Sequence, residues 1–78
     1  MPPKVVAHRF KHDRPLFVRD NINSIHDICN TLHISYTEIA LFTGIRSCVI
    51  SGYANGAYFP NKEKYNKLAE FFDWEVWT

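Results

Sequence analysis

Residues 35–56, SYTEIALFTGIRSCVISGYANG, have the pattern of two short helices joined by one tight turn. Ser35 and Glu38 stand three positions apart and form a capping box, which predicts that a helix begins at Ser35. Gly44 can adopt the left-handed conformation that ends this helix and turns the chain sharply. The apolar residues that would hold the two helices together are Ile39, Ala40, Ile45, Val49 and Ile50. Helices joined in this way are typical of proteins that place a helix in the DNA major groove.

The same segment resembles the helix-turn-helix of the lambda-repressor-like family, also called the XRE family, which includes phage Cro and repressor proteins and many antitoxins. The resemblance covers residues 25–74, about two thirds of the chain. It is carried by Ser35, Glu38, Ile39, Ala40, Gly44, Ile45, Ile50, Ser51, Tyr53, Asn55, Gly56, Pro60, Leu68 and Ala69. It implies a mainly α fold, a small lambda-repressor-like bundle of four to five helices.

The chain departs from the family pattern at positions that would face DNA. Family members usually carry Gln at the position of Tyr36 and Ser at that of Arg46, and they place longer polar side chains along the second helix. Here only Arg46 could make a bidentate contact to guanine, which is worth about 1–3 kcal/mol of discrimination. Further recognition would rest on hydroxyl groups, on contacts to thymine methyl groups and on DNA shape.

The resemblance assigns residues 46–53 to a recognition helix that enters the major groove of double-stranded DNA. The residues expected to face bases are Arg46, Ser47, Cys48, Ser51 and Gly52, of which Gly52 would contribute only close approach. The residues expected to contact phosphates are Tyr36, Thr37, Tyr53, Asn55, Tyr58 and Lys62. The helix that begins at Ser35 would support these contacts, because its free N–H groups point toward the DNA backbone.

Positive charge is concentrated ahead of this segment. The whole chain has a net charge of +1, but residues 1–20 hold five basic residues against Asp13 and Asp20, a local balance of +3. The basic residues are Lys4, Arg9, Lys11, Arg14 and Arg19. They form either an arm that contacts phosphates or a DNA groove, or a solvated basic tail.

The N-terminal residues also contain two β-prone runs, residues 5–10 and 16–18, and residues 12–15 between them favour a turn. These runs predict a β-hairpin. It would need to pack on the helices or pair with a second subunit, because an isolated hairpin is only marginally stable. The chain is therefore divided into residues 1–20, an extended basic arm or hairpin, and residues 21–78, the helix-turn-helix domain.

Two further helices are predicted from apolar residues at helical spacing. One helix would follow a cap at residue 23 or 24 and end near residues 32–33, and the other would span residues 62–72. The first stripe consists of Ile25, Ile28, Cys29 and Leu32, and the second of Tyr65, Leu68, Ala69 and Phe72. Both stripes are interpreted as core.

The C-terminal tail, residues 71–77, is more aromatic than a small core readily buries. An exposed aromatic patch typically marks an interface. We therefore expect a homodimer interface formed by Phe71, Trp74, Val76 and Trp77. In the alternative, Trp74 and Val76 close the core and Trp77 lies on it.

Composition limits the class of protein. The chain has 78 residues, enough for one domain, and its apolar content of 46% is too high for disorder. No apolar run approaches the ~20 residues of a membrane span. No signal sequence follows Met1, so we expect a cytoplasmic protein with no membrane partner.

Motifs for chemistry are not found in the sequence. The four histidines and two cysteines show no zinc-ligand spacing, so we expect free thiols, no metal and no cofactor. There are no paired carboxylates on an apolar background, no Gly-rich phosphate loop and no nucleophile elbow. We therefore expect no enzymatic activity.

Together these features predict a sequence-specific DNA-binding transcriptional regulator. It would be a small repressor of the phage or mobile-element type that binds operator DNA as a homodimer. The alternative is a protein-interaction module on the same scaffold, antitoxin-like or an inhibitor of a protein partner. The low net charge, the nearly uncharged recognition helix and the aromatic tail suit that alternative.

Overall fold

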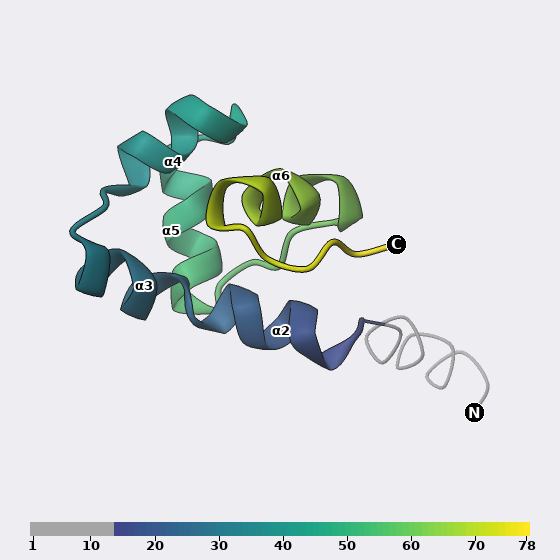
Figure 1. Cartoon of the computed structure of the whole chain (residues 1–78). Coiled ribbons are helices and arrows are strands. Elements are labelled where there is room, and N and C mark those ends of the chain that lie inside the picture. The colour runs from purple at the N-terminus through teal and green to yellow at the C-terminus, as the bar shows by residue number, and fades with distance from the viewer. Residues whose placement is uncertain (1–13) are drawn as a thin grey trace.

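The computed structural model describes residues 14–78, which form five α-helices and no strand (Figure 1). The helices are α2 (Leu16–Asn23), α3 (Ile25–Leu32), α4 (Tyr36–Thr43), α5 (Ser47–Asn55) and α6 (Lys62–Phe72). Helix α5 packs against α2, α3 and α4, and α6 packs against α4. The predicted mainly α fold is confirmed for this part of the chain.

Helices α4 and α5 are joined by the turn that the sequence predicts. The Glu38 N–H donates to Ser35 Oγ at 3.2 Å and the Ser35 N–H donates to Glu38 Oε1 at 3.0 Å, which completes the capping box. Gly44 ends α4 with a φ of +78°, and its N–H donates to the Ala40 carbonyl at 2.8 Å. The predicted start and end of this helix are therefore confirmed.

A buried threonine stabilises the same turn, and sequence analysis did not single it out. The Thr43 hydroxyl donates to the Ile39 carbonyl at 2.8 Å and accepts from the Ile45 N–H at 3.2 Å. Ile39, Ile45 and Ile50 are buried in the core as expected. Ala40 and Val49, also expected there, are only partly buried and pack against its edge.

The predicted N-terminal hairpin is wrong in its second strand. Residues 16–18 form the first turn of α2, and Val18 is fully buried. Val18 and Ile22 lie on one face of the helix and pack into the core, an apolar burial that an isolated hairpin would not provide. Residues 5–10, the other predicted strand, lie outside the described residues. The boundary expected after residue 20 falls inside α2, so residues 16–20 belong to the helical unit.

Helix α6 spans the predicted residues, and the tail after it folds back on the same helix. Trp74 stacks on Tyr65 with ring centroids 5.8 Å apart, and Trp77 meets the same ring edge-on at 6.0 Å. The side chain of Asn66 binds the backbone of Trp77 twice, accepting from its N–H at 2.8 Å and donating to its carbonyl at 2.9 Å. Both tryptophans are therefore half-buried within their own chain, as in the alternative interpretation, whereas Val76 is exposed rather than part of the core.

The Tyr65 hydroxyl joins α2 to this tail, which generates a test of the fold. It donates to the Glu75 carbonyl at 2.8 Å and accepts from the Asn21 amide at 3.0 Å. Tyr65→Phe is expected to lower the free energy of unfolding by about 1–2 kcal/mol, because two partners lose a hydrogen bond. Urea denaturation followed by circular dichroism measures this change.

The matched control is Tyr58→Phe, which removes the same atom from a tyrosine that is 59% exposed. It is expected to change stability by less than about 0.5 kcal/mol. Equal effects of the two substitutions would contradict the role assigned to the Tyr65 hydroxyl.

Candidate nucleic-acid interface

Helix α5 has one buried side and one open side. Ile50 and Tyr53 are buried, whereas the side chains on the opposite side of the helical wheel are exposed or half-exposed. These residues are Ser47, Cys48, Ser51 and Asn55, and we call their surface the outer face of α5. The structure thus brings together three residues that were expected to face bases, with Asn55 beside them. All four side chains are short and uncharged, so a flat or concave surface could approach the helix backbone closely.

Arg46 stands at the N-terminal end of this face. It is the N-cap residue of α5, it is exposed, and its side chain makes no capping hydrogen bond. Its carbonyl accepts from the N–H groups of Val49 and Ile50, which are therefore satisfied. Its side chain lies beside Val49 on the wall of a cavity between the turn and α6, and the exposed guanidinium group could make a bidentate contact from there.

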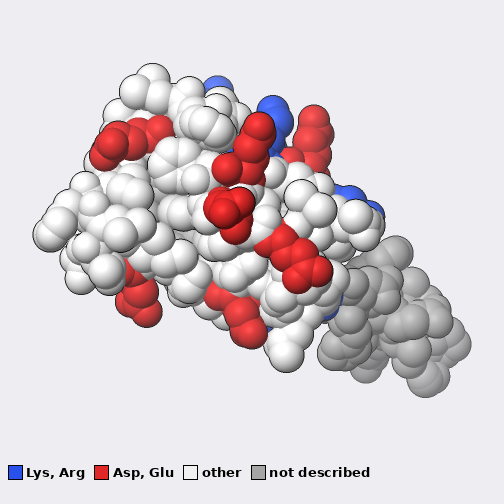
Figure 2. Space-filling model, viewed as in Figure 1, with Lys and Arg blue, Asp and Glu red and all other residues white. Residues whose placement is uncertain are grey.

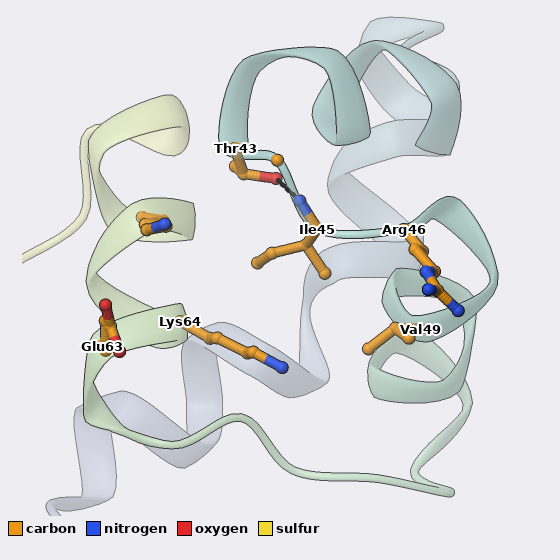
Figure 3. A pocket seen from close by; sticks show the side chains of 8 residues that line it. Thr43, Ile45, Arg46, Val49, Glu63 and Lys64 are labelled. Atoms are coloured by element: carbon orange, nitrogen blue, oxygen red, sulfur yellow. Dashed lines mark hydrogen bonds between the residues drawn. The ribbon is translucent and has the colours of Figure 1, made fainter.

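A cavity of about 450 Å³ lies between the α4–α5 turn and α6 (Figure 3). Arg46 and Val49 line one side, and Lys64 points into the space from α6, with Lys67 also on its wall. Glu63 is the one acidic residue of the lining, so basic groups outnumber acidic ones three to one. The N-terminal end of α5 is therefore flanked by positive charge.

A second cavity, of about 440 Å³, lies at the other end of α5. Arg14 and Arg19 line it together with Gly56, the C-cap residue of the helix. The Arg14 guanidinium lies 4.0 Å from the centre of the Phe59 ring, a cation–π contact that holds it in place. Of the five basic residues expected in an N-terminal arm, these two flank α5, and Lys4, Arg9 and Lys11 lie outside the described residues.

Two of the residues predicted to contact DNA are buried in the structure. Gly52 is buried, because the ring of Tyr58 lies where a side chain of residue 52 would be, so Gly52 cannot face bases. Tyr53 is only 3% exposed and belongs to the core, and burial raises the pKa of its phenol. Its position three residues after Ile50, on the core side of the helix, is the signal that could have excluded it.

The remaining phosphate candidates are accessible to different degrees. Thr37, Asn55 and Tyr58 are exposed. Tyr36 is half-buried, and its pKa is raised by burial and then by the neighbouring Cys29. Lys62 is exposed but already occupied, since its ammonium group donates to the backbone oxygen of Thr78 at 2.7 Å and lies 5.7 Å from the Trp77 ring centre.

Charge is unevenly spread over the surface. Figure 2 shows acidic side chains across the face that is seen there, with basic side chains mostly toward its margin. The acidic residues of the described chain are Asp20, Asp27, Glu38, Glu63, Glu70, Asp73 and Glu75. Such a face repels phosphates, so a DNA contact would need a different side of the molecule.

The two cysteines differ in exposure. Both are free thiols; Cys29 is buried and Cys48 is exposed on the outer face of α5. Burial raises the pKa of the Cys29 thiol, and the Glu38 carboxylate raises it further. At a given pH, Cys29 therefore has less of the reactive thiolate than an unperturbed cysteine has.

Comparison of the chain with protein-family models, with curated proteins and with solved structures gave no match. Within residues 14–78, no helix has the length and apolarity to cross a membrane, and no three His, Cys, Asp or Glu side chains are grouped to hold a metal ion.

The different exposure of the thiols gives a direct test of the outer face. A disulfide reagent added to the native protein at neutral pH is expected to modify one thiol quickly and the second only as the protein unfolds. Cys48→Ser should abolish the fast phase, and Cys29→Ser should leave it unchanged. Two fast phases, or a fast phase that persists in Cys48→Ser, would show that the open side of α5 is assigned incorrectly. Absorbance of the released thiol measures both rates.

Proposed function

We propose that this protein is a sequence-specific DNA-binding regulator that inserts α5 into the major groove. The observation that carries the proposal is the α4–turn–α5 unit, whose fixed turn leaves an accessible outer face of short, uncharged side chains on α5. An α-helix with short side chains fits the width of the major groove. The resemblance of residues 25–74 to lambda-repressor-like proteins supports the same function, and we propose that the protein belongs to that family.

In the proposed complex, the outer face supplies the base contacts. The hydroxyls of Ser47 and Ser51 can donate to or accept from base edges, and Cys48 offers an apolar contact to a thymine methyl group. Arg46, at the end of the face, can donate two hydrogen bonds to one guanine. Occupation of a promoter by this surface would repress transcription.

Phosphate contacts would come from both ends of α5. Lys64 and Lys67 flank its N-terminal end, and Arg14 and Arg19 flank its C-terminal end. The N–H groups of Tyr36 and Thr37, in the first turn of α4, would add to these contacts. Positive groups at both ends of a recognition helix match the two phosphate backbones that border a groove.

A second candidate function is a protein-interaction module. It is favoured by the exposed apolar side chains of Leu41 and Phe42 on α4 and by the acidic face in Figure 2. These features lie outside the outer face of α5. The two candidates differ in the ionic strength dependence of binding, because DNA binding releases many counterions and weakens steeply with salt, whereas binding through the apolar side chains of Leu41 and Phe42 would not.

The experiment that tests the proposed function is selection of the full chain against randomised double-stranded oligonucleotides, followed by affinity measurements over a range of salt. A defined sequence is expected, and the logarithm of its binding constant should fall with that of salt at a slope of about −3 to −5 per bound subunit, since roughly 0.9 is lost for each neutralised phosphate. Lys64→Gln should reduce the slope by about one per bound subunit. Recovery of no sequence, with affinity for DNA that salt does not alter, would contradict the proposal.

We also propose that the protein binds DNA as a homodimer. One recognition helix covers few base pairs, and two half-sites about 34 Å apart require a two-fold partner. The tryptophans of the tail pack on their own chain, so the more accessible apolar surface is Leu41, 82% exposed, and Phe42, 56% exposed. The Phe71 ring lies 5.2 Å from that of Phe42 and extends this patch.

Sedimentation tests the dimer. Wild-type protein at tens of micromolar is expected to sediment as a dimer, and Leu41→Lys as a monomer. In a two-fold symmetric contact the substitution is present on both subunits, so it places two lysine charges in the apolar interface. Leu16→Lys is the matched control, since Leu16 is also exposed, at 69%, but lies on α2. A wild-type monomer that binds DNA as one subunit per site would contradict the dimer.

A further inference from the structure

A glycine on the open side of α5 is covered by an aromatic ring. Gly52 follows Cys48 by one helical turn, yet it is buried, and the atoms that a side chain there would meet belong to Tyr58. A glycine inside a helix lowers stability by about 1 kcal/mol relative to alanine. The contact with Tyr58 gives a physical reason for glycine at this position, because no larger residue leaves room for the ring.

The loop after α5 holds Tyr58 in this position. Gly56 turns the chain with a φ of +82°, and the N–H groups of Ala57 and Tyr58 donate to the Gly52 carbonyl at 2.9 and 3.3 Å. The loop thus folds back along the helix. Tyr58 is still 59% exposed, so one part of the ring lies on the helix backbone and the rest projects outward.

We propose that Tyr58 is a specificity-determining residue, which contacts a thymine methyl group in the major groove with the exposed part of its ring. This inference rests on the proposed function. Ser47, Cys48 and Ser51 are small, whereas the ring of Tyr58 covers the neighbouring Gly52 and is 59% exposed, so it could extend the contact surface beyond them. A tyrosine that only bound phosphate would not need its ring seated on the recognition helix. The exposed ring is apolar, and the methyl group of thymine is the apolar feature of the major groove.

The experiment compares wild type, Tyr58→Phe, Tyr58→Ala and Gly52→Ala, all as full chains, on the DNA sequence that wild type selects. Arg46→Ala is included as a reference, because its effect depends on the proposed function and not on Tyr58. Each thymine of the site is replaced in turn by uracil, which removes only the methyl group. Circular dichroism confirms that each variant is folded.

Tyr58→Ala is expected to weaken binding about tenfold and to abolish the preference for thymine at one or two positions, different from the position that Arg46→Ala affects. At those positions the change from thymine to uracil should weaken the binding of wild type and Tyr58→Phe but not that of Tyr58→Ala. Gly52→Ala should act like Tyr58→Ala, because the added methyl group displaces the ring without removing it.

Two results would overturn the inference. If Tyr58→Ala weakens binding equally on all sequences and wild type tolerates uracil everywhere, Tyr58 contacts phosphate or nothing; the proposed function then still stands if Arg46→Ala alters the preferred sequence. If wild type selects no sequence, the inference and the proposed function fail together.

Discussion

The hydroxyl group of Thr43 fixes the turn on which the arrangement of α4 and α5 depends. It binds the Ile39 carbonyl inside α4 and the Ile45 N–H beyond the turn, so it joins the end of one helix to the approach of the next. Thr43 is buried, and a buried hydroxyl without partners would cost about 1–3 kcal/mol. Gly44 provides the positive φ that the same turn requires. With the turn fixed, Ile45 and Ile50 enter the core together, and the opposite side of α5 is left open to solvent.

The C-terminal tail completes a core that five short helices close only in part. Tyr65 is fully buried, its ring contacts Trp74 and Trp77, and its hydroxyl links α2 to the tail. A chain of this size buries only about 60% of the surface that its unfolded state exposes. The packing of Trp74 and Trp77 on Tyr65 therefore makes up a substantial share of the apolar surface that this small protein buries. Because these rings pack within the chain, the surface left for association shifts to Leu41 and Phe42.

The elements that can be predicted from the sequence are those with local signals. The capping box at Ser35, the glycine at position 44 and the apolar spacing of residues 62–72 act within a few residues, and each structure forms where expected. Residues 16–18 favour a strand locally, but burial of Val18 against elements far along the chain favours a helix. The packing of the Tyr58 ring over Gly52 could not be predicted. Tyr58 belongs to the loop that follows α5, and no local sequence pattern specifies the path of that loop.

In the proposed complex, affinity and selectivity come from different parts of the surface. The outer face of α5 is uncharged, whereas Arg14 and Arg19 stand at one of its ends and Lys64 and Lys67 near the other. Phosphates attract these groups on every DNA sequence alike, so they would hold the helix in the groove without choosing a site. Selection would be left to Arg46, to the short side chains of the outer face and to the ring of Tyr58, which act only at contact distance. A long basic side chain in the middle of α5 could bind phosphates in many alignments of the helix along the DNA. Without such a side chain, close contact would be restricted to the alignment in which the short side chains fit the bases.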